Sequence, residues 1–512
     1  MKQLFTLLIA TFILSLSANA QRYTLDSFDV RTGLGPSNPS MFTPFGNKLY
    51  FFATDIVNFD VMFETDGVTA PSLVGNPSST PKSGNNAVGK AAVELGGIMY
   101  YSASLSATGR ELYKYDGVSQ QVLELDVEPG TTGSNPQNLT VFNNKIYFTT
   151  KVSGIVGIME YDPNTKILRK LTDKYPDTLT DEFYHNAAGF FVVGNKLCFT
   201  AKTSANGTEL FEYDTIADTI RLVSDINTGT ASSLPHALHV YANKLYFAAI
   251  DSAYGCELWS YDGSNAPTRL TDIQPGKHFG IPYNATSTRV QIIGYNGNLY
   301  FSALSDTTVN PKPMLYRHEI ATSNTTLVYD NKNGIGNQGP AINFIIYGND
   351  LFYQDKYLYY GAIWTYDGTD TPRVIKFNNG NTVTRSFYEP TIFNKSIYFR
   401  SESTAKGIEL YKFTDSVVGI DDVKASSLTS IVAYPNPTTD NVQLSFFVKQ
   451  PMALSVNITN IKGEVVYTKL RQRYSGGRNM ISIPMSELPA GMYIYSIVND
   501  GTVLNIGKIM MQ

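Results

Sequence analysis

The 512-residue sequence has little of several residue types, and each shortage argues against a class of protein. With two cysteines, it is not a small scaffold held together by disulfides. Charged residues make up 16% of the chain and give a net charge of −4, which argues against a general binder of nucleic acid or anionic membranes. Tryptophan is rare, but 34 tyrosines, 28 phenylalanines and 43% hydrophobic residues are typical of a folded, β-rich protein.

The first twenty residues have the pattern of a secretory signal peptide. Lys2 is followed by the apolar run Leu4–Leu16 and by Ala18-Asn19-Ala20, a small-x-small cleavage pattern. The alternative, a membrane anchor, needs a longer apolar run. Gln21 follows instead of the cysteine of a lipoprotein, and no later run is long enough for a transmembrane helix. We therefore expect an exported mature chain that has no transmembrane span.

The two cysteines leave two possibilities open. Cys198 stands inside a strand-like segment, and Cys256 stands at the start of the strand-like segment ELWSY one repeat later. They form either one disulfide or two buried free thiols, because a free cysteine behaves as a small apolar residue.

A hairpin pattern recurs eight times along residues 21–415. Its clearest copy, at 242–263, has two aromatic-rich strands, a polar loop between them and a closing Asp-Gly turn. The third residues of the eight first strands stand at positions 50, 100, 147, 198, 246, 300, 352 and 398. A period near 50 with four strand-like segments is typical of a β-propeller blade. We predict an all-β fold of eight four-stranded blades, with seven as the alternative.

The last repeat lacks a clear final strand before the chain leaves the propeller. Either Tyr23–Val30, a strand-like segment at the mature N-terminus, or Val417–Val423 can supply it. We favour the N-terminal segment, which would join the first and last blades.

The ELW-x-x-DG hairpin followed by D-I-x-P-G resembles the repeats of secreted Bacteroidetes proteins described as hyalin-like or propeller-repeat proteins. This resemblance covers residues 23–415, although several copies have Tyr or Phe in place of Trp. It implies an extracellular propeller and no single activity.

After a small, polar linker at 416–430, residues 431–512 alternate apolar and polar residues in short strands. This pattern predicts a small Ig-like antiparallel β-sandwich. The segment also resembles the type A C-terminal sorting domain of the type IX (Por) secretion system. The resemblance rests on the turn at Asn460–Gly463 and on Pro435, Asn436, Pro437, Gly463, Leu488, Gly491, Tyr493 and Lys508. It implies binding to the type IX machinery through 431–512, passage across the outer membrane, and usually removal of the domain with attachment to the cell surface. Gln512 departs from the basic residue common at the end of the family.

In an up-and-down blade, alternate connections open on opposite faces. The short turns fall on one face, and the longer loops fall on the other, where binding residues are more often found. These longer loops are Asn76–Gly89, Leu105–Arg110, Glu128–Asn138, Lys202–Thr208, Asp251–Gly255, Gln274–Thr286, Asp306–Pro313 and Asn331–Pro340. Within them, Phe279 and Tyr283, beside His278, could stack on a sugar ring, although packing within the loop explains them equally well.

Catalytic and metal-binding patterns are weak. His236 and His239 form an H-x-x-H, but on a regular strand two residues three apart point to opposite faces. The recurring Asp126, Asp173, Asp225, Asp272 and Asp330, like the aspartates of the Asp-Gly turns (66, 116, 262 and 367), favour turn or cap roles over calcium sites. We expect no cofactor, no metal and no catalytic residues.

Two hypotheses of function remain. The first is a non-enzymatic surface or secreted protein whose propeller binds a glycan or an extracellular protein. The second is a secreted carbohydrate-active or other hydrolase whose paired carboxylates come from different blades. Glu182, Asp251 and Asp306 lie in or near loops, but nothing in the sequence pairs any two of them.

Overall fold

The computed structural model describes most of the chain after the predicted signal peptide. The described residues are 23–31, 35–54, 60–75, 92–152, 155–175, 179, 189–283, 290–304, 313–328, 341–355, 362–369, 371–375, 386–403, 407–415, 428–448, 452–460, 465–475, 477–499 and 502–512. The signal-peptide prediction and the alternative closing strand Val417–Val423 lie outside these residues. The chain divides into two compact units, Met1–Asp415 and Ser416–Gln512.

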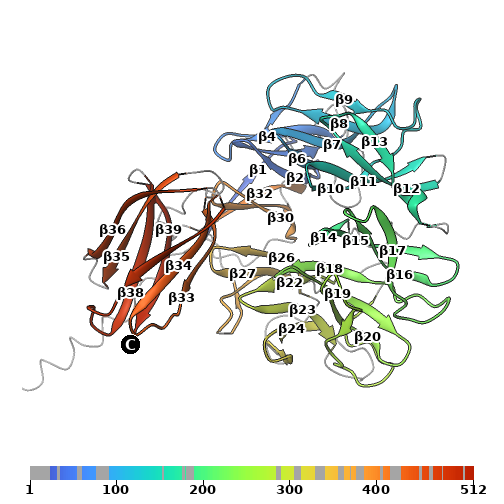
Figure 1. Ribbon diagram of the computed structural model, residues 1–512. Helices are drawn as coiled ribbons and strands as arrows, with labels where there is room; N and C mark the ends of the chain where they lie inside the picture. Colours follow the sequence, from blue (N-terminus) through green and yellow to red (C-terminus); the bar gives the residue numbers. More distant parts are fainter. Residues whose placement is uncertain are drawn as a thin grey trace, which may run out of the picture. The chain divides into compact units, whose positions relative to one another are not determined.

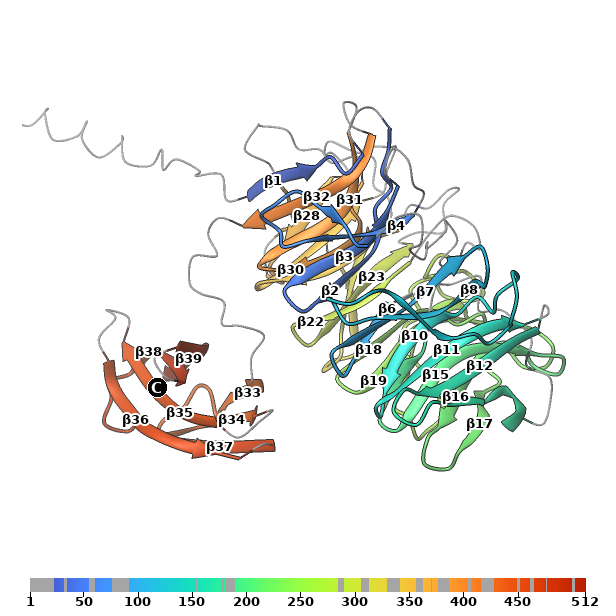
Figure 2. The same ribbon diagram turned by 90° about the horizontal axis from the view of Figure 1, so that it is seen from above.

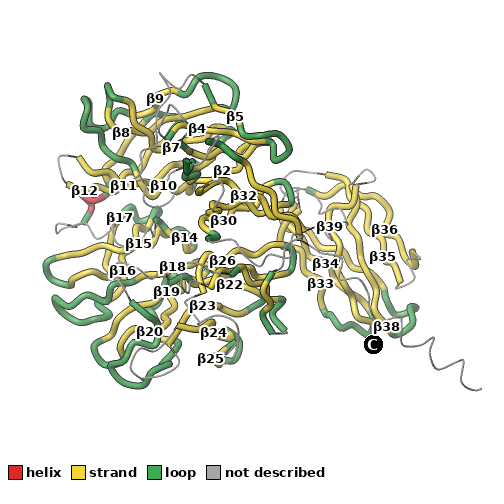
Figure 3. The backbone as a smooth tube through the Cα atoms, turned by 180° about the vertical axis from the view of Figure 1, so that it is seen from behind, coloured by secondary structure: helices red, strands yellow, loops and turns green. Residues whose placement is uncertain are grey.

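The first unit consists of eight four-stranded antiparallel sheets, as the repeat predicted. Figure 1 shows them following one another around a common centre, with their first strands innermost. Most of these inner strands contact one another directly, as β6 does β2 and β10, β18 does β14 and β22, and β30 does β26, and β2 contacts β30 to complete the ring. Figure 3 shows strands and loops almost throughout, with one short helical turn, η1 (Thr172–Lys174).

We number the sheets blade 1 to blade 8. Blades 1 to 4 comprise β2 (Ser40–Phe45), β3 (Lys48–Ala53), β4 (Val61–Thr65) and β5 (Ser72–Leu73); β6 (Ala92–Leu95), β7 (Ile98–Leu105), β8 (Gly109–Tyr115) and β9 (Val122–Leu125); β10 (Gln137–Phe142), β11 (Lys145–Val152), β12 (Ile155–Asp162) and β13 (Ile167–Lys170); β14 (Phe191–Val193), β15 (Lys196–Thr203), β16 (Gly207–Asp214) and β17 (Thr219–Ser224).

Blades 5 to 8 comprise β18 (His236–Tyr241), β19 (Lys244–Asp251), β20 (Gly255–Tyr261) and β21 (Thr268–Arg269); β22 (Ile292–Tyr295), β23 (Asn298–Leu304), β24 (Pro313–Glu319) and β25 (Asn324–Leu327); β26 (Ala341–Tyr347), β27 (Asp350–Asp355), β28 (Ile363–Tyr366) and β29 (Arg373–Val374); β30 (Tyr388–Phe393), β31 (Ser396–Ser403), β32 (Gly407–Asp415) and β1 (Tyr23–Phe28).

The second strand of each blade is apolar on both faces because each sheet lies between two others. In β19 five consecutive residues, Leu245–Ala249, are buried. Tyr246 and Ala248 pack in one core cluster, whereas Leu245, Phe247 and Ala249 pack in the next. Burial on both faces therefore stabilises the stack of blades mainly through apolar surface removed from water.

The N-terminal strand closes the ring, as predicted. β1 pairs antiparallel with β32 from Tyr23↔Asp415 to Phe28↔Leu410, and Figure 2 shows the two side by side. The Tyr23 ring stacks on Phe413 with 4.9 Å between centroids. Blade 8 is thus built from the two ends of the propeller sequence.

The second unit is a small β-sandwich. One sheet has the order β33 (Leu428–Tyr434), β34 (Asn441–Val448), β37 (Gly477–Pro484), and the other has β36 (Val465–Tyr474), β35 (Met452–Asn460), β38 (Gly491–Asn499), β39 (Thr502–Met511). Alternate residues of the strands meet in one core, such as Val442 and Leu444 with Val456 and Ile458.

Candidate functional site

A buried glutamate anchors the long loops in four blades. Each of these glutamates is fully buried and accepts hydrogen bonds from the segment that leads to the next blade; they are Glu111, Glu209, Glu257 and Glu409. Glu209 accepts the Ser233 N–H at 2.8 Å, the Ser233 O–H at 2.5 Å and the Ile226 N–H at 3.2 Å. Burial raises the pKa of all four carboxyl groups, although these donors oppose the shift. The donors on the carboxylates make them structural anchors.

The loops above Glu257 carry an aromatic patch on blade 5. Tyr254, in the loop between β19 and β20, is 40% exposed, and Phe279, in the loop between β21 and β22, is 37% exposed. Among the described propeller residues they are the two exposed aromatic side chains. Since the rings of a propeller normally pack between blades, two exposed rings on neighbouring loops mark a candidate binding surface.

Tight local contacts hold the two loops together. Gly255 has φ +72°, and a Cβ placed on it would lie 1.9 Å from the His278 carbonyl oxygen. The Ile281 N–H donates to the Cys256 carbonyl at 2.9 Å. Only glycine therefore allows the loop that carries Tyr254 to approach the loop that carries Phe279 this closely.

Arg269 fixes the Tyr254 ring. Its guanidinium carbon lies 3.7 Å from the centre of that ring. One guanidinium nitrogen donates to the Thr271 carbonyl oxygen at 2.6 Å and lies 3.6 Å from the Asp272 carboxylate. A cation held over an aromatic face in this way pre-organises the surface.

The predicted ligand residues divide between the surface and the interior. His278 and Phe279 are exposed, whereas Tyr283 is half-buried with its ring 5.2 Å from the ring of His236. Their role in binding stays a prediction. Sequence reasoning missed Tyr254 and Arg269 as partners of this patch. The available signal was a tyrosine beside the glycine of a predicted long loop.

Three of the predicted long loops lie wholly or mostly outside the described residues. Asn76–Gly89 and Asn331–Pro340 lie outside the described residues, as do Glu182 and most of Asp306–Pro313. A carboxylate pair that includes these segments stays an untested part of the hydrolase hypothesis.

The expectation that His236 and His239 face opposite ways was wrong. The strand bulges between them, with Ala237 at φ +54°, so that they pair with Ala248 and Tyr246, two residues apart on one side of β19. The ring of His236 contacts the Leu234 carbonyl oxygen, and His239 Nε2 accepts the Gly294 N–H. Within the described part of the chain, no group of three His, Cys, Asp or Glu side chains is placed to hold a metal ion.

The turn role of the Asp-Gly aspartates is confirmed. Asp66, Asp116, Asp262 and Asp367 each accept the backbone N–H two residues further on. Among the other recurring aspartates, Asp225 accepts the Gly229 N–H. Asp173 forms an ion pair with Lys170, and Asp272 forms one with Arg269. Asp126 is exposed, and Asp330 lies outside the described residues. Both cysteines are buried and free.

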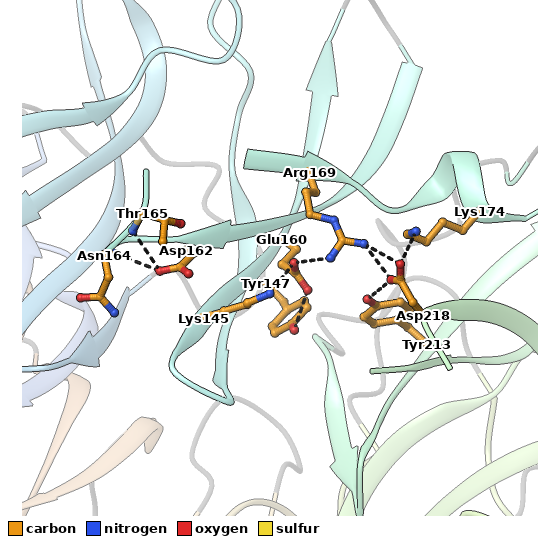
Figure 4. Close-up of polar contacts among 10 residues, drawn as sticks. All are labelled: Lys145, Tyr147, Glu160, Asp162, Asn164, Thr165, Arg169, Lys174, Tyr213 and Asp218. Carbon is orange, nitrogen blue, oxygen red and sulfur yellow. Dashed lines mark hydrogen bonds and ion pairs between the residues drawn. The ribbon is translucent and has the colours of Figure 1, made fainter. Parts of the chain in front are cut away.

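The charged side chains between blades 3 and 4 form ion pairs with one another. In Figure 4, Arg169 lies between Glu160 of blade 3 and Asp218 of blade 4, with distances of 2.9 Å and 2.7 Å. Glu160 also accepts from Lys145 and Tyr147, and Asp218 from Lys174 and Tyr213. These donors hold the pKa of the Asp218 carboxyl well below its usual range, although partial burial opposes the shift. The cluster therefore links blades 3 and 4.

The second unit presents its own candidate site, where the Pro-Asn-Pro segment meets the end of the chain. The Asn436 side-chain amide donates to the Lys508 carbonyl and accepts the Met510 N–H, both at 2.8 Å. Thr438 then pairs in parallel with Met511, and the Gln512 N–H donates to the Thr438 carbonyl. Both proline peptide bonds of this segment, at Pro435 and Pro437, are cis. The Pro-Asn-Pro segment and the end of β39 thus form one element.

The other predicted sorting residues lie near this element or support its sheet. Tyr493 pairs with Ile509 of β39, and its hydroxyl donates to the Pro489 carbonyl at 2.8 Å. Leu488 packs on the core, Gly491 begins β38 opposite Met511, and Lys508 is exposed. Gly463 lies outside the described residues. Recognition by these side chains stays a prediction.

Solved structures share a distant likeness with the chain. A puromycin hydrolase is 11% identical over 73% of this chain and 59% of its own, with a TM-score of 0.41. An oligogalacturonate lyase from Vibrio parahaemolyticus is 11% identical over 74% of this chain and 98% of its own, with a TM-score of 0.42. TolB from Acinetobacter baumannii is 11% identical over 68% of this chain and 78% of its own, with a TM-score of 0.31. No curated protein matches the chain by sequence.

One family matches the second unit. The family described as "Secretion system C-terminal sorting domain" matches residues 432–512. None of the helices in the described residues has the length and apolarity to cross a membrane. Residues 432–512 are therefore a secretion system C-terminal sorting domain, which indicates export through the type IX (Por) machinery to the cell surface or the medium.

Proposed function

We propose that this chain is an exported binding protein whose propeller recognises an extracellular glycan through the aromatic patch of blade 5. The observation that carries the proposal is the exposure of Tyr254 and Phe279 on two loops locked together at Gly255 and His278. A sugar ring presents a C–H face that packs on an aromatic ring, and hydroxyl groups that need hydrogen-bond donors. Arg269, Lys277 and His278 supply such donors around the patch.

A rigid surface of this kind favours binding over catalysis. Arg269 already contacts Tyr254, Thr271 and Asp272, so ordering the patch costs little when a ligand arrives. The buried Glu257 beneath the patch accepts hydrogen bonds from Thr271 and Ile273, which leaves it no role as an exposed nucleophile or acid.

The experiment uses purified residues 21–512 and a panel of soluble and insoluble polysaccharides and extracellular proteins. Binding is measured by co-sedimentation and calorimetry for the wild type, Tyr254→Ala and Phe279→Ala. We expect binding to a glycan to weaken about tenfold or more in each variant, because a contact worth about 1.4 kcal/mol changes the dissociation constant tenfold.

The matched control is Ile216→Ala, which removes an exposed apolar side chain (82% exposed) from a short turn of blade 4. It should bind as the wild type does. Unchanged binding in both aromatic variants would refute the site. If the chain binds only an extracellular protein of the panel, the ligand is a protein and the glycan proposal is wrong. New reducing ends or peptides that accumulate with time would support the hydrolase hypothesis instead.

A further inference from the structure

The edge strand β36 of the second unit exposes apolar side chains to solvent. It carries Val465, Val466 and Leu470, which are 58%, 37% and 80% exposed. Figure 1 shows β36 at the margin of its sheet, beside β35. The strands of a sandwich normally direct their apolar residues into the core, as β35 does with Leu454 and Val456. Three exposed apolar residues on one strand therefore mark a surface that the fold itself does not bury.

Two bulges in β36 account for most of this exposure. The register of β36 against β35 shifts twice along the ladder. At one shift Val466 has no partner on β35, and at the other Leu470 and Arg471 both stand opposite the single residue Ser455. A bulge leaves its extra residue out of the ladder and re-aims the side chains beside it. The exposure of Val466 and Leu470 is thus built into the backbone of β36.

The same region carries unpaired positive charge. Residues 465–486 contain no acidic residue and four cations, which are Lys469, Arg471, Arg473 and Arg478. Within the described part of this unit, Lys469, Arg473 and Arg478 form no ion pair with a carboxylate. The cations in Figure 4, by contrast, are each paired with a carboxylate of the propeller. The β36 region therefore combines exposed apolar side chains with an excess of positive charge.

This surface is separate from the element that the Pro-Asn-Pro segment forms with β39. β36 and β39 are the opposite edges of one four-stranded sheet, and β39 contacts β33 of the other sheet. None of the residues predicted for sorting lies on β36. The cationic edge is therefore a second surface of this unit, with its own chemistry.

We propose that the β36 edge docks on an anionic lipid surface. Val465, Val466 and Leu470 enter the headgroup layer, while the charged groups of Lys469 and Arg473 lie among the lipid phosphates. The excess of positive charge on this edge complements the negative potential of such a surface. A chain exported to the cell surface meets a lipid layer there.

The two bulges favour a lipid surface over an acidic polypeptide. A polypeptide that adds a strand to β36 needs a regular row of backbone N–H and C=O groups along the free edge. The bulges interrupt that row and twist the strand. A lipid layer needs only apolar side chains and cations on one edge.

The test measures binding of purified residues 21–512 to lipid vesicles by co-sedimentation. One set of vesicles contains phosphatidylglycerol and phosphatidylcholine in equal amounts, and the other contains phosphatidylcholine alone. The chain should bind the anionic vesicles and not the neutral ones. Binding should weaken steeply at about 1 M salt, where the Debye length falls to about 3 Å. Equal binding to both sets, or no binding to the anionic set, would overturn the proposal.

Two variants separate the apolar part from the electrostatic part. Leu470→Ser should weaken binding to anionic vesicles about tenfold, because the burial of a leucine side chain is lost. The double variant Arg473→Gln, Arg478→Gln should weaken it about fivefold for each charge removed, because a cation near an anionic surface contributes about 1 kcal/mol. The matched controls, Val118→Ser and Lys244→Gln, make the same two kinds of change at exposed positions of the propeller and should bind as the wild type does.

The substituted side chains are exposed, so each variant should keep the denaturation midpoint of the wild type. Undiminished vesicle binding in either folded variant contradicts the assignment. Displacement of the chain by inorganic phosphate, with Leu470→Ser unaffected, would mean a simple anion site. Binding of poly-L-glutamate without binding of vesicles would mean an acidic polypeptide, and either result overturns the lipid proposal. Tyr254→Ala should bind vesicles as the wild type does, so failure of the glycan proposal is distinguishable.

Discussion

Substitution of Glu209 tests the claim that a buried carboxylate anchors the long loop in four of the blades. Glu209→Ala removes the acceptor of three donors: the N–H and O–H of Ser233 and the N–H of Ile226. Each buried donor without a partner costs about 1–3 kcal/mol, and neighbouring losses are not fully additive. We therefore expect the free energy of unfolding to fall by about 3–5 kcal/mol, a large part of the about 5–15 kcal/mol typical of a folded protein.

Glu209→Gln separates hydrogen bonding from charge. The amide keeps one acceptor oxygen and turns the other into a donor that faces donors, so we expect a loss of about 1–3 kcal/mol. Denaturant unfolding, followed by tyrosine fluorescence, gives both values. Gln120→Ala, at an exposed position in the turn between β8 and β9, is the control and should change stability by less than about 0.5 kcal/mol. A loss in Glu209→Ala no larger than in this control would refute the anchoring role.

Four further predictions follow from burial, charge and closure. Burial raises the pKa of Glu209 above its ordinary 4.5, so its contribution to stability is fully present below pH 4.5 and is lost as the pH rises through the raised value. The denaturation midpoint of the wild type should therefore rise as the pH is lowered from neutrality towards 4.5, and Glu209→Gln should reduce that rise. Hydrogen bonds from the Asn265 backbone lower the pKa of Asp262 to about 2. Its contribution to stability is therefore present above pH 3.8 and should be lost as the pH falls towards 2. In Asp262→Ala the denaturation midpoint should fall less steeply with pH over this range than in the wild type. Both cysteines are buried, and burial raises the pKa of the Cys198 thiol to about 12. Both should therefore react with a thiol reagent only after denaturant is added. Rapid labelling of the native chain would contradict their buried position. Deletion of residues 21–28 removes β1 and exposes the edge of β32. The shortened chain should therefore unfold at a lower denaturant concentration and aggregate. Unchanged stability would mean that β1 does not close the ring.

The repeat was readable from sequence because stacking constrains it strongly. A second strand buried on both faces, such as Leu245–Ala249, must be apolar throughout, and an Asp-Gly turn must recur where the chain reverses. The same logic identified β1 as the missing strand of blade 8. The Pro-Asn-Pro segment was recognisable by resemblance, but its pairing with Lys508 and Met510 joins residues more than seventy positions apart, which no local pattern indicates.

Features that depend on irregular backbone or on contacts between loops escaped sequence reasoning. The bulge at Ala237 reverses the facing of His239 relative to a regular strand. Glu257 looks like the polar edge of a strand in the sequence, yet it is fully buried because Thr271 and Ile273 fold over it. The place of Tyr254 on the same patch as Phe279 could not be predicted, because it depends on the contact of Gly255 with His278, which brings two loops of one blade together.

The most direct test of the account asks whether the C-terminal unit alone carries the export signal. A signal peptide, a periplasmic reporter enzyme and residues 416–512 are fused and expressed in a bacterium that has a type IX secretion system. The account predicts that the reporter reaches the cell surface or the medium. Asn436→Ala, which removes both side-chain bonds to the terminal strand, should leave more of the reporter in the periplasm. Retention of the unsubstituted fusion in the periplasm would contradict the account.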